Sequence, residues 1–377
     1  MEAASAYHKA AEISPDSNAA LFVAFCLRDA GKIEEAIASF KEYIRSRPKD
    51  VDGWTGLGVM LKDKLRYEES VPFLANALRL KSNPEIRNTL ISSLWRIGQN
   101  DKAQKLGLIN LQEKDARALR VFVESPYKDY KLREGGKGFD PEHPSRNIIS
   151  FSLWGDRPEY VTGAIVNAQI AKHMYVNWTA RFYCDESVPS DALRLLRGYG
   201  AEIVMMNRPE HQHIRPMWRF LASDDPGVNV FVCRDADSRL NAKELIAVHD
   251  WLLSEKRFHI MRDHIYHHEL ILAGMWGGMA GVLPNITEWL AQGSTYFNNK
   301  FGDQAFLADM VWPLIRNDMK VHDTYYAFPN AKNFPRGYDL PGLIHVGGSV
   351  KSMPDWRKFP YTNEANLNRN EHADPVI

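Results

Sequence analysis

Residues 228–241 read V-N-V-F-V-C-R-D-A-D-S-R-L-N, an apolar and β-branched run that gives way abruptly to polar residues at Arg234. Such a run is typical of a buried strand in a sheet that is covered on both faces. Ligands of these sheets bind beyond the carboxyl ends of the strands. Asp235 and Asp237 would lie at that edge, on the same side of the strand. Two oxygen donors so placed suit Mg²⁺ or Mn²⁺, so we expect a metal site, although D-x-D triplets also serve as turns or helix caps.

The composition is that of a folded protein with two or three domains. The chain has 377 residues, and 47 basic side chains balance 47 acidic ones, so no nucleic-acid partner is expected. Three distant cysteines, without a C-x-x-C motif, indicate buried thiols in a reducing compartment. The N-terminus does not resemble a signal peptide, and the most apolar segment is too short to span a bilayer. We therefore expect a cytoplasmic protein that is not membrane-spanning.

The first third of the chain is repetitive. Residues 17–50 and 51–84 align with each other at a period of 34 residues. The first unit is marked by Leu27, Gly31, Ala36, Phe40 and Pro48, and the second by Trp54, Leu57, Gly58, Leu61, Leu74 and Ala77. This period and pattern resemble the tetratricopeptide repeat, a helix-turn-helix unit whose small residues let paired helices pack closely. We expect such a helical solenoid over residues 1–120. It would be a scaffold or self-association surface, or a groove that holds a peptide acceptor.

Residues 121–147 are predicted to be a linker, because glycine, proline and charged residues gather there. Residues 148–356 follow as an α/β domain, and the polar residues 357–377 form a tail. Alternating strands and helices in this domain predict a doubly wound parallel sheet. Strands are expected at 148–155 (running into a turn), 178–184, 201–206, 228–233 and 258–262, with a late strand from Val321 and another at 343–348. Helical patterns are expected at 160–170, 189–199, 217–222, 242–254 and 305–314, and a flexible turn at 274–279. Asn241 and Glu244 have the spacing of a capping box.

Four polar groups are expected at the same sheet edge: Arg157, the Asp235/Asp237 pair, Asp303-Gln304 and His345. In this order the chain resembles the GT-A class of nucleotide-sugar glycosyltransferases, which carry a D-x-D triplet after an apolar strand. The glycogenin-like branch also has an Asp-Gln pair that opens a helix and a late H-x-x-G-x-x-K segment. Here these correspond to Asp303-Gln304 and to His345, Gly348 and Lys351. The resemblance covers roughly residues 148–356 and implies a GT-A fold, Rossmann-like and of mixed α/β type.

The resemblance implies roles for these residues. Mn²⁺ or Mg²⁺ would be held by Asp235, Asp237 and His345, and would neutralise the diphosphate that leaves the donor. A UDP- or GDP-sugar donor would contact Arg157, Arg234, Asp235, Asp263, Gly348 and Lys351. The acceptor would be a glycan, a lipid-linked glycan or a protein.

Asp303 and Gln304 are the catalytic candidates. If the enzyme inverts, Asp303 would be the general base on the acceptor hydroxyl. If it retains, the Asp-Gln pair would steady the reacting sugar. The chain lacks the N-S-G-V segment of the glycogenin-like branch and has A-G-M-W-G at 273–277 instead, so the stereochemistry and the sugar stay open.

Alternative interpretations fit the sequence less well. A zinc site is not expected at His264, His267 and His268, because no downstream ligands have the required spacing. The sequence does not decide whether Trp218, Arg219 and Trp276 are core residues or ligand-binding residues. A haloacid-dehalogenase-like phosphatase would need threonine or valine where Arg239 stands, and would place the triplet on its first strand. A repeat scaffold joined to an inactive transferase domain remains the non-enzymatic alternative.

Overall fold

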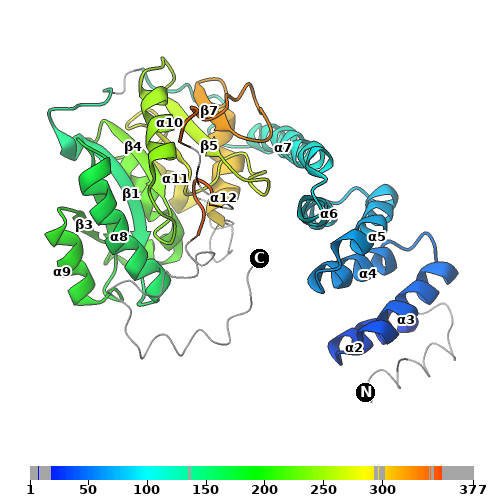
Figure 1. Cartoon of the computed structure of the whole chain (residues 1–377). Helices are drawn as coiled ribbons and strands as arrows, with labels where there is room; N and C mark the ends of the chain where they lie inside the picture. The colour runs from blue at the N-terminus through cyan, green and yellow to red at the C-terminus, as the bar shows by residue number, and fades with distance from the viewer. Residues whose placement is uncertain are drawn as a thin grey trace. The chain divides into compact units, whose positions relative to one another are not determined.

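The computed structural model describes Tyr7 and residues 18–134, 137–292, 296, 302–338, 340 and 344–349. The chain divides into two compact units, Met1–Asn110 and Leu111–Ile377 (Figure 1). Lys351 and the predicted tail at 357–377 lie outside the described residues. Among the residues that are described, no helix combines the length and the apolar character needed to cross a membrane.

The first unit consists of consecutive helices that pack in pairs. They are α2 (Ala19–Asp29), α3 (Ile33–Ser46), α4 (Val51–Asp63), α5 (Tyr67–Leu80), α6 (Pro84–Arg96) and the first part of α7 (Asn100–Phe122). Glycines permit the close approach: a Cβ atom on Gly58 would lie 2.6 Å from Leu74 Cγ, and one on Gly56 would lie 2.7 Å from the Phe40 ring. The predicted helical repeats are therefore confirmed.

The second unit is built on a seven-stranded mixed sheet with the order β3-β2-β1-β4-β6-β5-β7. Figure 1 labels β3, β1, β4, β5 and β7 of this sheet. The strands are β1 (Asn147–Leu153), β2 (Thr179–Cys184), β3 (Glu202–Met205), β4 (Val230–Arg234), β5 (Phe258–Arg262), β6 (Trp276–Met279) and β7 (Met319–Asp323). β6 runs antiparallel to β4 and β5, whereas all other neighbours are parallel. The expectation of an all-parallel sheet was therefore wrong, although the α/β class is correct.

The predicted flexible turn at 274–279 is instead largely the buried central strand β6. A Cβ atom on Gly277 would lie 2.4 Å from the Phe231 carbonyl oxygen, and one on Gly278 would lie 2.5 Å from the Phe258 ring. The glycines in this segment thus serve close packing against β4 and β5. Their sequence signal is the same as that of a turn, which explains the error.

Helices cover both faces of the sheet. On one face, α8 (Pro158–Met174), α9 (Ser190–Gly198) and α10 (Ala242–Leu252) share an apolar core with β1, β2 and β4. On the other, the 3-10 helix η2 (Pro209–Ser223) packs against β1 and β4 and against α11 (Ile286–Gln292). The helix predicted at 305–314 is divided into α12 (Gly302–Phe306), a π-helical turn η4 (Leu307–Val311) and α13 (Trp312–Ile315), and a 3-10 turn η1 (Pro144–Arg146) precedes β1.

The predicted cap of α10 is half confirmed. Asn241 Oδ1 accepts a hydrogen bond from the Glu244 backbone N–H at 3.1 Å. The Glu244 carboxylate, however, binds Arg234 and Tyr175 in place of completing a reciprocal capping box. The strand predicted at 343–348 is not found in its described part, because residues 344–349 are irregular apart from a bridge between Ser349 and Ser238.

Candidate active site at the carboxyl edge of the sheet

The strand order places a topological switch point beside the Asp-Ala-Asp triplet. The chain fills the sheet outward from β1 to β2 and β3, and then returns to the other side of β1 with β4. Ligands of open α/β sheets bind at the carboxyl ends of the two strands that flank such a point. Asp235 and Asp237 follow β4 directly, and a pocket of about 160 Å³ follows β1. The pocket is lined by Ser152, Leu153, Trp154, Gly155, Arg157 and Tyr160.

The triplet is held against helix α8. Asn167 Nδ2 donates to the Ser238 carbonyl at 2.8 Å, and its Oδ1 accepts from the Leu240 N–H at 3.1 Å. A Cβ atom on Gly163 would lie only 1.9 Å from the Ala236 carbonyl oxygen, so only glycine allows this helix to approach so closely. These contacts fix the backbone of the triplet against α8.

Alternation along β4 separates Arg234 from Asp235. Successive side chains of a strand point to opposite faces. Arg234 therefore enters the core beneath α10, where it is 1% exposed and pairs with Glu244 at 3.1 Å. This location withholds the Arg234 side chain from the sheet edge, which argues against its predicted contact with a donor.

Arg219 of η2 joins two carboxylates that lie far apart in the sequence. Its Nη1 donates to Asp235 Oδ1 at 2.6 Å, and its Nη2 donates to Asp303 Oδ2 at 3.1 Å. The Arg219 and Asp303 side chains are largely buried, whereas the Asp235 side chain is 40% exposed. The triplet and the Asp-Gln pair are thereby brought into one site.

Burial raises the pKa of the Asp303 carboxyl above its ordinary value, and the nearby Asp235 carboxylate acts in the same direction. The Arg219 guanidinium opposes both effects. Asp303 Oδ1 also accepts a hydrogen bond from the Gln304 N–H at 2.8 Å, in the first turn of α12. The half-buried Gln304 lies beside it on the same turn.

His345 and Asp237 are linked by a short loop. Ser349 Oγ donates to Asp237 Oδ2 at 2.9 Å, and the Ser238–Ser349 bridge fastens the loop to the triplet. His345 Nδ1 lies 3.0 Å from the Val346 carbonyl oxygen, which can only accept. In the neutral ring Nδ1 therefore carries the proton and Nε2 keeps its lone pair. Burial lowers the pKa of His345, which favours that neutral form.

Gly348 lies against the His345 ring. A Cβ atom at this position would lie 3.4 Å from Nε2 and 3.1 Å from the His345 carbonyl oxygen. A larger residue would therefore be tight against the His345 carbonyl oxygen and in ordinary contact with the imidazole. The rings of His264 and His267 also surround His345, with centroids 4.4 and 4.8 Å away.

Asp263, at the end of β5, supports this loop from below. Its carboxylate accepts from Lys243 Nζ at 2.7 Å, from the Val346 N–H at 2.9 Å and from the Thr324 hydroxyl. The side chain is only 4% exposed. These buried hydrogen bonds let Asp263 position the segment that carries His345.

The remaining predicted residues are placed as follows. Arg157 occupies the N-cap position of α8 without a capping hydrogen bond from its side chain. It pairs with Glu159 and lies over the Tyr160 ring at 5.3 Å, in the lining of the pocket after β1. Lys351 is outside the described residues. Trp218 and Trp276 are both fully buried core residues, so neither offers a face to a ligand.

Two supporting residues were missed or left undecided by the sequence analysis. Arg219 was undecided because a lone arginine in a turn-rich stretch has no distinguishing pattern. Gly274 was assigned to a turn, yet a Cβ atom there would lie 2.1 Å from Asp235 Oδ2. A glycine at this position is evident from the sequence, but its close approach to Asp235 is evident only from the structure.

The donor atoms fit a hard divalent cation in their chemistry. Carboxylates and a neutral imidazole are suitable ligands for Mn²⁺, and Mg²⁺ commonly takes one or two carboxylates together with substrate phosphates. Among the described residues, no three or more His, Cys, Asp or Glu side chains form a group that could hold a metal ion, so the predicted trio of Asp235, Asp237 and His345 is not gathered into a metal centre in this structure. Phosphate oxygens from a donor would supply the additional ligands that such a cation needs.

No protein-family profile and no curated protein matches the chain. Solved structures similar to it include MamA, at 17% identity, a TM-score of 0.24, and coverage of 26% of this chain and 55% of MamA. YrrB, a tetratricopeptide-repeat protein with an unusual peptide-binding site, is 19% identical with a TM-score of 0.26, over 33% of this chain and 70% of YrrB. A mutant O-GlcNAc transferase from Thermobaculum terrenum is 14% identical with a TM-score of 0.28, over 69% of this chain and 50% of that one. This chain thus spans about half the length of two of them, and these likenesses are too distant to carry an argument about function.

Proposed function

We propose that the second unit is a metal-dependent glycosyltransferase of the GT-A type. It would move a sugar from a nucleoside-diphosphate sugar, with UDP or GDP as the nucleotide, to a glycan, a lipid-linked glycan or a protein. The observation that carries the proposal is the link through Arg219, which joins Asp235 of the triplet to Asp303. This link supports a single site in which Asp235 lies on the donor side and Asp303 on the acceptor side.

The donor would lie across the switch point between β1 and β4. The nucleoside would enter the pocket after β1, where Arg157 stands at the rim near the path of the diphosphate. Asp237 and His345, together with Asp235 as a third ligand, would hold Mn²⁺ or Mg²⁺. When bound, that cation would act as a Lewis acid that neutralises charge on the leaving diphosphate. Gly348 leaves room beside the imidazole, and Lys351 would add a positive charge near the diphosphate.

Asp303 would act on the acceptor side. Its buried carboxyl, with a pKa raised by burial, is more basic than an exposed aspartate and suits proton removal from a hydroxyl. Arg219 would keep it ionised and correctly oriented. If the reaction retains configuration, Asp303 and Gln304 would instead steady the transferring sugar.

The test is ligand-dependent thermal stability of the whole chain. Mn²⁺ with UDP or GDP should raise the melting temperature, because a ligand at 100 times its Kd stabilises by about 2.7 kcal/mol, equivalent to a shift of roughly 5 °C or more. The shift should vanish with chelator and in Asp237→Asn. The control, Asp129→Asn, removes the same charge from an exposed residue of the same unit and should keep the shift.

Absence of any nucleotide-dependent shift in a protein that melts cooperatively would contradict the proposal. It would favour the alternative of a repeat scaffold with an inactive second unit. The repeats themselves are proposed to bind a protein partner or another copy of the chain, since helical repeats present extended surfaces.

A further inference from the structure

The helical segment that carries Asp303 is made of three short pieces. α12 has five residues, η4 has five and α13 has four, and they follow one another without a break from Gly302 to Ile315. A helix as short as α12 is not stable by itself in water, because isolated helices below roughly 12 residues are marginal. The position of Asp303 in the first turn of α12 therefore depends on what the whole segment packs against.

Apolar contacts bury the start of this segment. The Phe306 ring is buried, and its centroid lies 5.3 Å from that of Trp289 and 5.7 Å from that of Tyr296. A Cβ atom on Gly302 would lie 1.9 Å from the Tyr296 carbonyl oxygen, so α12 begins in close contact with this residue. These contacts involve no charged side chain, and they leave Asp309 of η4 to be paired from another side.

The partner of Asp309 is Arg117 of α7. Asp309 is only 4% exposed, and Arg117 Nη1 and Nη2 donate to its two carboxylate oxygens at 2.7 and 3.2 Å. Paired hydrogen bonds of this kind fix direction as well as distance. Among the described residues, no other group donates to this carboxylate. Arg117 therefore balances a buried negative charge, which is costly to leave unpaired.

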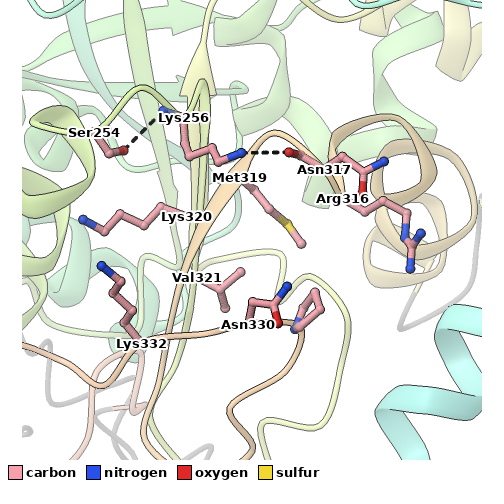
Figure 2. A pocket seen from close by; sticks show the side chains of 10 residues that line it. Ser254, Lys256, Arg316, Asn317, Met319, Lys320, Val321, Asn330 and Lys332 are labelled. Atoms are coloured by element: carbon pink, nitrogen blue, oxygen red, sulfur yellow. Dashed lines mark hydrogen bonds between the residues drawn. The ribbon is translucent and has the colours of Figure 1, made fainter.

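Asp115, two residues earlier on α7, extends the contact. It accepts hydrogen bonds from Trp312 Nε1 at 2.7 Å and from Arg316 Nη2 at 2.9 Å. Arg316 also lines a pocket of about 450 Å³ beside β7, and Figure 2 shows its side chain directed away from Lys320 of the same pocket. Asp309, Trp312 and Arg316 have the i, i+3, i+7 spacing of one helical face. Residues 115–117 of α7 thus contact the segment along that face.

We propose that Arg117 is a positioning residue for Asp303. By holding Asp309, it fixes the helical segment where Asp303 meets Arg219 at 3.1 Å. π-helical turns are rare and frequently lie at functional sites, and the one that contains Asp309 follows α12 directly. This role rests on the proposed function, because the position of Asp303 matters for catalysis only if the second unit is a transferase.

Hydrogen-exchange mass spectrometry of the whole chain tests whether Arg117 orders the segment. Arg117→Gln should speed exchange at residues 303–311 by about tenfold, because an unpaired buried carboxylate favours local opening. Exchange in β1, at residues 147–153, should stay unchanged. The matched control, Arg120→Gln, removes an exposed arginine of the same helix and should exchange like the wild type.

The conservative variant Arg117→Lys keeps the charge but loses the paired hydrogen bonds. Its exchange at residues 303–311 should lie between those of the wild type and Arg117→Gln. Arg117 is 57% exposed, so both variants should fold, which their melting temperatures will check. Arg117→Lys still decides the matter if Arg117→Gln does not fold.

Steady-state kinetics connect the order of the segment to Asp303. The assay measures release of UDP from UDP-glucose and of GDP from GDP-mannose in the presence of Mn²⁺. Arg117→Gln should lower kcat by about 10-fold to 100-fold, since a displacement of about 1 Å can have that effect. The KM for the donor should stay within about twofold, because the proposed donor site lies beyond β1 and β4.

Three results would overturn the proposal. Equal exchange at residues 303–311 in Arg117→Gln and Arg120→Gln would show that the ion pair does not order the segment. An equal rise in β1 would show that Arg117 stabilises the whole unit and positions nothing in particular. Faster exchange at 303–311 with unchanged kcat would show that this order does not set Asp303. A wild type that releases neither nucleotide would count against the proposed function instead, and the exchange experiment would still decide whether Arg117 orders the segment.

Discussion

Arg219 shows how one side chain can set the protonation of another. Its guanidinium lies between Asp235 and Asp303, and it counteracts the burial that raises the Asp303 pKa. If Asp303 is the general base, it must be ionised to act. The pH at which activity falls on the acid side should then report the balance between burial and Arg219.

Replacing Arg219 by glutamine should move the acid limb of kcat/KM to higher pH, because the influence that lowers the Asp303 pKa is lost. Activity at neutral pH should fall by about 10²-fold, within the usual range for general-base catalysis. Arg219→Lys retains a positive charge and should recover part of both effects. A loss of activity without movement of the acid limb would mean that Arg219 only holds the site together, and that Asp303 is not the base.

At the scale of elements, β5 and β7 are joined by a buried pair of histidines. His259 Nε2 lies 2.8 Å from His322 Nδ1, and His322 Nε2 lies 3.0 Å from Asp250 Oδ2. Burial holds the pKa of His259 well below its ordinary value, and the neighbouring His322 acts in the same direction. The pKa of His322 is also lowered by burial, although Asp250 partly opposes this. Both rings are therefore neutral in the folded protein at neutral pH.

This pair predicts a loss of stability in acid. The unfolded chain protonates its histidines below about pH 6.5, whereas the folded chain keeps these two neutral to lower pH. The free energy of unfolding should therefore decrease as pH falls below about 6.5, by up to about 1.4 kcal/mol per pH unit for each such histidine. Denaturant unfolding between pH 7.5 and 5.5 measures the slope.

The variant His259→Gln should have a shallower slope than the wild type, since one buried histidine no longer resists protonation. His173→Gln, on the exposed part of α8, is the control and should follow the wild-type slope. Parallel slopes for His259→Gln and the wild type would show that the buried pair does not govern the acid response.

At the scale of the whole molecule, the boundary between the two units falls inside α7 and not in the stretch before β1. The residues of α7 after Asn110 belong to the second unit. Asp115 accepts hydrogen bonds there from Trp312 Nε1 at 2.7 Å and from Arg316 at 2.9 Å, and Arg117 pairs with Asp309 at 2.7 Å. The last part of a repeat-like helix is thus an integral part of the sheet-containing unit.

Asp115→Ala should destabilise the second unit by about 1–3 kcal/mol, because it leaves the fully buried Trp312 indole without its hydrogen-bond acceptor. Differential scanning calorimetry measures the change, with exposed Asp129→Ala as the control. Equal stability of the two variants would mean that this end of α7 adds nothing to the second unit.

The sequence by itself determined the features that depend on neighbouring residues. The helical repeats, the strand before Asp235, the strand at Phe258–Arg262 and the Asn241 cap were all predicted correctly. Periodicity and capping arise from contacts within a few residues, so a single sequence contains them.

Only the tertiary structure decided the direction of β6, the burial of Arg234 and the position of Arg219 between Asp235 and Asp303. Each of these results from pairing between segments that are distant along the chain. A glycine needed for close packing and one needed for a turn also look identical until the neighbour is known. The candidate site residues could therefore be named from the sequence. Their spatial arrangement was decided by packing between distant segments of the chain.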